Sequence, residues 1–180
     1  MEIAFVTTNE GKFKEAQHIF AKYGITLRQV KVELPEIRAE NVDEVVEKKV
    51  IAAFEASEGP AISDDTGLFI PSLNGFPGAV SGYFYRTLGF ESILKLVKPG
   101  TPAVFRTAVG YCDGKESKIC VGEHEGTIVK PRGKDGWGFD PVFLPRGRTK
   151  TYAEDVHYKN ENSHRARAFK KLALWLSEKG

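Results

Sequence analysis

The sequence predicts an α/β protein with a mixed central sheet flanked by helices. Strand-like apolar runs alternate with helical patterns over residues 2–70, and a hairpin pattern follows over residues 102–112 and 115–129, joined at Asp113-Gly114. Alternation of strands and helices favours parallel strands, whereas a hairpin adds antiparallel ones, so both directions are expected in one sheet. The last predicted element is a helix from Ser163. Its apolar side comprises Phe169, Leu172, Ala173 and Leu176.

The first half of the chain predicts two strands and two helices in alternation. Residues 2–7 form a short apolar strand, and residues 25–32 form a second one. The helix between them is closed by Gly24, and a second helix is expected over residues 42–57 with Asn41 as its cap. Apolar residues recur at helical spacing in both helices: Phe13, Ala16, Phe20 and Tyr23 in the first, and Val42, Val45, Val46, Val50, Ala53 and Phe54 in the second.

The size and composition indicate a single ordinary globular domain. A chain of 180 residues, 41% apolar and 28% charged, fits one domain, spanning residues 1–180, with room for a substantial core. No run of 18 apolar residues is present, and the start MEIAFVTT is too short and wrongly flanked for a signal peptide. Cys112 and Cys120 match neither a zinc site nor a disulfide framework. We therefore expect a cytoplasmic protein without membrane association.

Charge alone does not identify a partner. The net charge of +2 is too small to indicate nucleic-acid binding. The stretch from Arg146 to Lys171, however, holds eight Lys and Arg residues against three acids. This stretch predicts either a solvated helix face with a basic loop or a funnel for an anionic substrate. Both interpretations remain open at this point.

A polar turn, Thr7-Thr8-Asn9-Glu10-Gly11-Lys12, lies where the first strand ends and the first helix begins. Ligands of α/β sheets usually bind at such a place. Gly11 permits close approach of the backbone to a phosphate, the threonines and the asparagine offer hydrogen bonds, and Lys12 adds a positive charge. The glycine spacing does not match a Walker loop. An ordinary capped turn without a function is the alternative.

Two groups of acids are candidates for a metal site. The strand of residues 61–63 is expected to end at Asp64-Asp65, before a further strand over Leu68–Ile70, and Glu36 lies in a loop. Adjacent strand residues point to opposite faces, so we expect one acid of the pair to act with one from elsewhere. Substrate oxygens and water would complete an octahedral Mg²⁺ shell, with Mn²⁺ also suited to oxygen ligands. A strand-capping Asp-Asp turn without a metal is the alternative.

Two further segments carry candidate binding residues. In the segment Gly136–Phe143, glycines beside aromatic residues favour a ring that lies against a flat ligand, or else aromatic residues that close over the core. In Ser163-His164-Arg165, with Lys159 just upstream, cations lie at a helix start. Unpaired N–H groups and the helix dipole make such a start suitable for an anion.

These segments together resemble a known family. The set TTNEGK, SDDTGLFIPSLNGFPGAVS, WGFDPVFLP, TYAE and SHRARAF is similar to the inosine triphosphate pyrophosphatases, also called non-standard purine NTP pyrophosphatases or Ham1-like proteins. The similarity runs from Thr7 to the final helix. It implies a fold of two lobes with the active site in the cleft between them, usually in a homodimer. It also implies Mg²⁺-dependent hydrolysis of inosine, deoxyinosine and xanthosine triphosphates to the monophosphate and pyrophosphate.

The resemblance also implies roles for individual residues. Asp65 would be the catalytic proton acceptor and, with Glu36, the metal-associated acid. Lys49 would face the phosphates, unless its neighbour Lys48 does so. The implied substrate-binding residues are Thr8, Asn9, Glu10, Gly11 and Lys12 for the phosphates, with Thr7 supporting them; Thr66; Trp137, Gly138, Phe139 and Asp140 for the base, with Phe139 stacking on it; and Lys159, His164 and Arg165.

Selectivity is expected at the six-position of the purine. A keto oxygen there accepts hydrogen bonds from backbone N–H groups and Arg165, whereas the amino group of adenine would leave donors facing donors. Two other functions are alternatives. One is a Maf-like pyrophosphatase that acts on other modified or pyrimidine nucleotides. The other is a non-catalytic nucleotide- or RNA-binding module that uses the basic C-terminal face.

Overall fold

The computed structural model describes residues 1–35 and 37–179, and within them it contains a mixed seven-stranded sheet of order β2-β1-β3-β5-β6-β7, with β4 paired to β3 outside this path. The strands are β1 (Glu2–Val6), β2 (Thr26–Val30), β3 (Ala61–Phe69), β4 (Pro77–Gly78), β5 (Pro102–Cys112), β6 (Ser117–Ile128) and β7 (Phe143–Pro145). The α-helices are α1 (Glu10–Ala21), α2 (Val42–Ser57), α3 (Ser81–Leu88), α4 (Val156–Asn162) and α5 (His164–Ser177). Short 3₁₀ turns are η1 (Pro71–Leu73), η2 (Phe90–Lys95) and η3 (Asp140–Val142).

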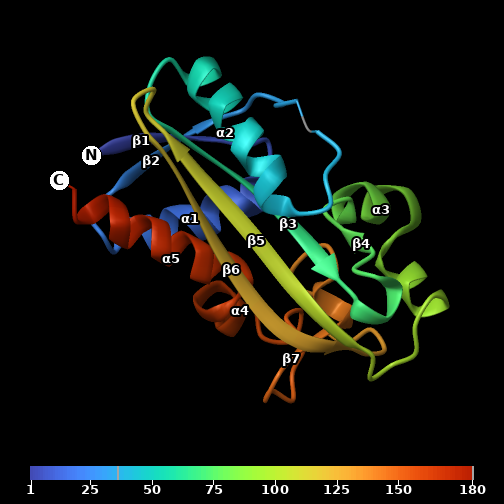
Figure 1. Ribbon diagram of the computed structural model, residues 1–180. Coiled ribbons are helices and arrows are strands. Elements are labelled where there is room, and N and C mark those ends of the chain that lie inside the picture. Colours follow the sequence, from blue (N-terminus) through green and yellow to red (C-terminus); the bar gives the residue numbers. More distant parts are fainter. Residues whose placement is uncertain (36, 180) are drawn as a thin grey trace.

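The predicted mixture of strand directions is confirmed. Strand β1 pairs in parallel with both β2 and β3. Strands β3, β5, β6 and β7 pair antiparallel, and the β5–β6 hairpin turns at Asp113 and Gly114 as the sequence predicts. Figure 1 shows this hairpin running along most of the molecule. Among the described residues, none of the helices combines the length and apolar character that a membrane span needs.

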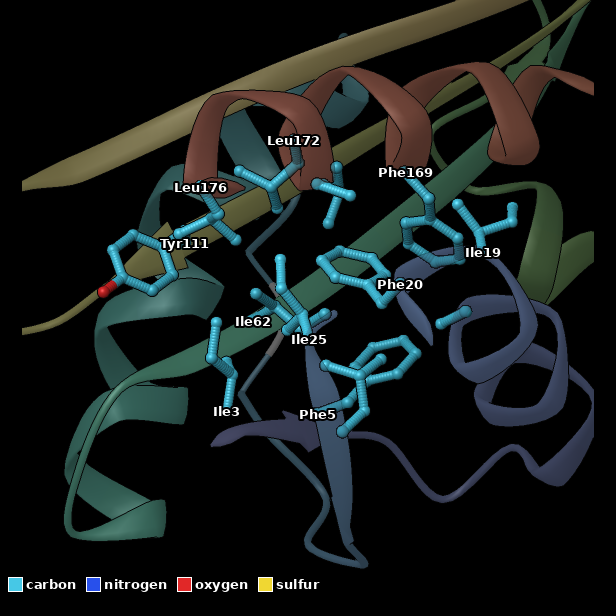
Figure 2. Close-up of a cluster of buried hydrophobic side chains, with 14 of the residues drawn as sticks. Ile3, Phe5, Ile19, Phe20, Ile25, Ile62, Tyr111, Phe169, Leu172 and Leu176 are labelled. Carbon is cyan, nitrogen blue, oxygen red and sulfur yellow. The ribbon is translucent and has the colours of Figure 1, made fainter. Parts of the chain in front are cut away.

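Helices cover both faces of the sheet. Helices α1 and α5 lie on one face and α2 on the other (Figure 1). Because strand side chains alternate, Ile3 and Phe5 of β1 pack under α1 and α5, while Ala4 and Val6 pack toward α2. Figure 2 shows the larger cluster, in which Phe169 of α5 contacts the rings of Phe5 and Phe20 edge-on.

A second hydrophobic cluster lies further along β3 and β5. On β3, Ile62 belongs to the first cluster and Leu68 to the second. On β5, Val109 belongs to the first and Phe105 to the second. The strand residues between the two clusters are polar on this face of the sheet, and they include Asp64. This polar interval is where the candidate site lies. The two-lobed arrangement and the single-domain assignment stay predictions.

One strand prediction was wrong. Asp64 and Asp65 do not end a strand, because β3 continues without a break from Ala61 to Phe69. Strand β5 pairs with β3 along this whole length, from Ala61 opposite Cys112 to Phe69 opposite Val104. This partner supplies the backbone hydrogen bonds that keep the polar middle of β3 extended. The strand predicted over residues 68–70 is the end of the same β3.

Other element boundaries follow the predictions closely. Helix α2 begins after Asn41 as expected, although the Asn41 side chain donates to Glu44 and does not cap the backbone. Helix α5 begins after Ser163, whose hydroxyl accepts from the backbone N–H of Ala166. Helices α3 and α4 and the short strands β4 and β7 were not predicted, because they are too short to show a period.

Candidate active site

The site lies at the carboxyl end of β1, where the chain connections diverge. From β1 the chain passes through α1 to β2 on one side, and from β2 it passes through α2 to β3 on the other side. Ligands of α/β sheets bind at such switch points. The pairing of β1 with β3 ends at Phe5 and Ile62. The following residues of β3 therefore lie beside the turn that leads from β1 into α1.

The polar turn from Thr7 to Lys12 is organised by its own side chains. Asn9 caps α1, because its Oδ1 accepts from the backbone N–H of Lys12 at 3.0 Å. The Thr7 hydroxyl accepts from the Asn9 backbone N–H at 3.2 Å. Thr8 and Glu10 are exposed, and Glu10 pairs with Lys31. The turn is thus a capped helix start. This geometry agrees both with a phosphate-binding turn and with an ordinary turn that has no function.

Lys12 and Arg165 bind the two oxygens of one buried carboxylate. Lys12 Nζ lies 3.1 Å from Asp64 Oδ1, and Arg165 Nε lies 3.2 Å from Asp64 Oδ2. Burial by itself raises the pKa of Asp64, but Lys12, Arg165 and Lys49 outweigh burial and hold this pKa below its usual range. Asp64 therefore stays charged and fixes a cation from α1 beside one from α5.

Glu15 extends the network along α1. Its Oε2 accepts from Arg165 Nη1 at 2.9 Å, and its Oε1 lies 3.2 Å from Lys159 Nζ. Burial raises the pKa of Glu15, but these two cations outweigh burial and lower it overall. Lys159 Nζ also donates to Asp140 Oδ2 at 2.7 Å. Each buried cation therefore has at least one carboxylate partner, which buried charges require.

Trp137 joins the aromatic loop to the turn at the start of α1. Its ring lies under Lys159 Nζ at 4.7 Å and the Arg165 guanidinium at 4.6 Å. An ideal Cβ at Gly11 would lie 3.2 Å from Trp137 Nε1. The missing side chain of Gly11 thus leaves room for the indole. The backbone N–H of Trp137 donates to Asp140 Oδ2 at 2.8 Å, so Asp140 holds the loop in place.

The two aromatic residues of this loop differ in exposure. Gly138, with φ +67°, makes the turn between Trp137 and Phe139. Phe139 is 4% exposed and packs against the rings of Phe84 and Tyr85. Trp137 is 37% exposed. In this structure the Trp137 side chain is partly exposed, whereas Phe139 is part of the second hydrophobic cluster. Stacking of a base on Phe139 stays a prediction.

The start of α5 is buried. Ser163, His164 and Arg165 are each at most 2% exposed. The Arg165 guanidinium also donates to Thr66 Oγ1 at 3.1 Å. Burial, together with the neighbouring cations Arg165 and Lys159, holds the pKa of His164 well below its ordinary value, so its ring is neutral. The network around Asp64 and Glu15 therefore includes three of the predicted substrate contacts, namely Thr66, Arg165 and Lys159.

Of the two predicted metal acids, Asp65 lies among the described residues. Asp65 follows Asp64 in β3 and points to the opposite face of the sheet, as the alternation predicts, and it is half-buried. Glu36 lies outside the described residues. Among residues 1–35 and 37–179, no group of three His, Cys, Asp or Glu side chains is arranged to hold a metal ion. Lys49 is half-buried and its charge acts on Asp64, whereas Lys48 is exposed.

The basic C-terminal stretch largely pairs with its own surroundings. Arg148 pairs with Asp155, and Lys170 pairs with Glu161. A surface hollow of about 390 Å³ at this face is lined by Glu123, His124, Glu125, Arg146 and Arg167, none of which was predicted as a site residue. The exposed cations of this stretch therefore fit a solvated surface, whereas Lys159 and Arg165 are buried in the candidate site.

Three residues of the network were not predicted as site residues. For Asp64, the sequence shows the acidic pair, but the family resemblance assigns the role to Asp65. Glu15 lies one helical turn after Lys12, so its place on the same face of α1 was a usable signal. Thr107, whose Oγ1 lies 2.6 Å from Thr66 Oγ1, cannot be identified from the sequence alone, because nothing local shows that it lies opposite Thr66 of β3.

Comparisons with known proteins agree over nearly the whole chain. Residues 3–175 match the model of the Ham1 family. The dITP/XTP pyrophosphatase of Thermococcus kodakarensis is 43% identical and that of Pyrococcus horikoshii 42%, over 99% and 98% of this chain and 98% and 97% of theirs. The Staphylococcus aureus Ham1 protein has a similar structure, with a TM-score of 0.85 at 26% identity and 100% coverage of both chains. A HAM1 protein from Coxiella burnetii gives a TM-score of 0.82 at 28% identity, with 99% of each chain covered. The family predicted from the sequence motifs is thus confirmed, and the chain belongs to the Ham1 family.

Proposed function

We propose that this protein hydrolyses non-standard purine nucleoside triphosphates, namely dITP, ITP and XTP, to the nucleoside monophosphate and pyrophosphate. Two full-length relatives that are more than 40% identical are named dITP/XTP pyrophosphatases, which supports this substrate class. The structural observation that carries the proposal is the meeting of Lys12, Arg165 and Trp137 around Asp64 at the switch point of the sheet. Cations and a partly exposed aromatic ring that lie together suit a phosphorylated base.

The residues divide between the two ends of such a substrate. Lys12 and Lys49 supply positive charge for the phosphates, with backbone N–H groups of the turn Thr8–Gly11 nearby. Trp137 supplies a face for the purine, on which stacking contributes roughly 1–3 kcal/mol. Arg165 uses three of its nitrogens on Asp64, Glu15 and Thr66, and its remaining N–H groups are the donors we assign to the six-keto oxygen.

Asp65 is the proposed general base. Its half-buried carboxylate would orient a water molecule and take its proton as the water oxygen bonds to the α-phosphorus. The bond from that phosphorus to the bridging oxygen breaks, and pyrophosphate leaves. Carboxylate oxygens suit Mg²⁺ and Mn²⁺, so Asp65 and Glu36 would hold the ion, as the family resemblance implies. When bound, the ion neutralises charge on the triphosphate.

We assign the selectivity to hydrogen-bond donors at the six-position of the base. The Arg165 guanidinium only donates hydrogen bonds, so it binds a keto oxygen at the six-position. An amino group there is itself a donor and is rejected. Arg165 cannot turn away to suit adenine, because two carboxylates hold it. We further propose a homodimer, as the resemblance implies, and a cytoplasmic location, as the composition suggests; sedimentation equilibrium of the purified chain tests the dimer.

Pyrophosphate release tests the function. The purified chain is assayed with Mg²⁺ and dITP, ITP or XTP, and with dATP, dGTP and the pyrimidine triphosphates as comparisons. We expect turnover of the first group to exceed that of dATP by at least about 10²-fold, and EDTA to stop it. Equal rates for dITP and dATP contradict the selectivity. Preference for a modified or pyrimidine triphosphate favours a Maf-like activity instead. If no triphosphate is hydrolysed, salt-dependent RNA binding is the remaining alternative.

A further inference from the structure

The hydroxyl of Thr107 lies at the centre of a hydrogen-bonded chain that the proposed catalytic steps do not use. Thr107 is completely buried. Its Oγ1 lies 2.6 Å from Thr66 Oγ1 and 2.7 Å from His164 Nδ1. At the other end, Arg165 NH2 donates to Thr66 Oγ1 at 3.1 Å. The chain therefore runs from Arg165 through Thr66 and Thr107 to His164.

The sheet register holds these groups together. Thr66 of β3, Thr107 of β5 and Gly122 of β6 occupy one row across the sheet. An ideal Cβ at Gly122 would lie 2.1 Å from the carbonyl oxygen of His164, so the start of α5 packs directly on this glycine. Phe105 then stacks on the His164 ring at 4.5 Å and 22°. The ring has little freedom to move away from Thr107.

The hydrogen bonds of this chain have one favoured direction. A guanidinium only donates, so the Thr66 oxygen accepts from Arg165. The positive charge of Arg165 turns the lone pairs of Thr66 toward itself and the hydroxyl proton away, toward Thr107. Thr107 then donates its own proton to His164 Nδ1. Because Nδ1 accepts and the ring is neutral, the proton of the imidazole is on Nε2.

We propose, resting on the function proposed above, that Thr107 is a positioning residue: its hydroxyl keeps the Thr66 oxygen turned toward Arg165 and holds His164 as the Nε2–H tautomer. The other two acceptors of the Arg165 guanidinium are carboxylates, whose lone pairs need no such orientation. Thr66 is the acceptor whose direction depends on another residue. Without the Thr107 hydroxyl, the proton of Thr66 is free to rotate toward Arg165, and the guanidinium loses one of its three fixed partners.

Two variants at one position separate the hydroxyl from packing. Thr107→Val keeps the volume and removes the hydroxyl, and Thr107→Ser keeps the hydroxyl. We expect Thr107→Val to raise KM for dITP about tenfold with little change in kcat, because a contact made equally in the bound and transition states is lost. Thr107→Ser should stay near the parent. An unchanged KM in Thr107→Val, or equal losses in both variants, overturns the proposal.

A double-mutant cycle tests whether Thr107 acts through Thr66. If it does, the double variant Thr66→Val/Thr107→Val loses no more kcat/KM than Thr66→Val alone. Additive losses overturn the assignment. Thermal unfolding of each variant checks that the fold is retained, and Thr107→Ala replaces Thr107→Val if the latter does not fold.

Nitrogen-15 NMR of the histidine rings tests the relay without any turnover. His124 and His164 are buried, whereas His18 and His157 are exposed. We expect one buried ring whose Nδ1 carries no proton and whose Nδ1 signal shifts in Thr107→Val but not in Thr107→Ser. A proton on Nδ1 of the responsive ring, or no responsive ring, overturns the proposal. If the parent protein does not hydrolyse dITP, the proposed function fails, while these spectra still decide the relay.

Discussion

Asp64 and Arg165 are 101 residues apart in the sequence, yet Arg165 Nε donates to Asp64 Oδ2 at 3.2 Å in the interior. Both side chains are 1% exposed. The second oxygen of Asp64 binds Lys12 at 3.1 Å. One carboxylate in the middle of β3 therefore ties the first turn of α1 to the first turn of α5, and the candidate site is built around it.

Replacing Asp64 tests how much this carboxylate stabilises the fold. Asp64→Asn keeps the shape but leaves the buried Arg165 and the partly buried Lys12 with less compensation, so we expect a loss of about 3–5 kcal/mol in the free energy of unfolding, measured in urea. Glu161→Gln is the control, because Glu161 pairs with Lys22 and His18 at the surface and should contribute less than about 1 kcal/mol. Equally small losses in the two variants would contradict the buried role of Asp64.

The buried histidines predict that stability falls in mild acid. Burial, with Arg167 nearby, lowers the pKa of His124 to about 4, and the pKa of His164 is also lowered. Below pH 6.5 the unfolded chain therefore binds protons that the folded chain does not, and stability falls as the pH decreases. The slope reaches about 1.4 kcal/mol per pH unit for each histidine.

Urea midpoints between pH 7 and 5 measure this slope. The variant His124→Asn keeps an acceptor for the Tyr152 hydroxyl, which lies 2.6 Å from His124 Nδ1, and removes one titrating group. Its unfolding free energy should depend less steeply on pH than that of the parent. An identical slope in the two proteins would mean that His124 is not held neutral by the fold.

Asp65→Asn tests the proposed base. We expect turnover of dITP to fall about 10²- to 10⁴-fold, because asparagine cannot take the proton of the attacking water. The unfolding curve should stay close to that of the parent, since Asp65 is half-buried. Asp113→Asn is the matched control, because Asp113 lies at the tip of the β5–β6 hairpin, where it accepts from the backbone N–H groups of Lys115 and Glu116. Near-parental turnover in Asp65→Asn refutes the assignment.

Substitutions of Trp137 and Phe139 are expected to have different effects, the first on substrate binding and the second on stability. Trp137→Ala should raise KM for dITP about 5- to 150-fold, which corresponds to the roughly 1–3 kcal/mol of base stacking, with a small effect on folding. Phe139→Ala should cost about 3–5 kcal/mol of stability, because the ring is buried against Phe84 and Tyr85. Steady-state kinetics and urea unfolding measure both. The reverse pattern would return the stacking role to Phe139, as the resemblance implies.

Local patterns in the sequence predicted most of the elements correctly. The helical spacing of apolar residues predicted α1, α2 and α5, and Asp113-Gly114 predicted the β5–β6 turn. These features depend on neighbours a few residues away, so they can be read without knowing the fold. The motif set also predicted the family, and the comparisons confirmed it.

Only the tertiary structure decided which polar residues pair with one another and which are buried. The sequence placed the pair Asp64-Asp65 at a strand end, but β5 pairs along β3 and keeps the strand extended through both acids. It could not show that Asp64 faces Lys12 and Arg165, that Glu15 bridges two cations, or that Phe139 is buried while Trp137 is exposed. The cations that pair with Asp64 and Glu15 lie 52 to 150 residues away from them in the sequence. A charge becomes buried and paired only when strands and helices from distant parts of the chain pack together, and no local pattern records which ones do.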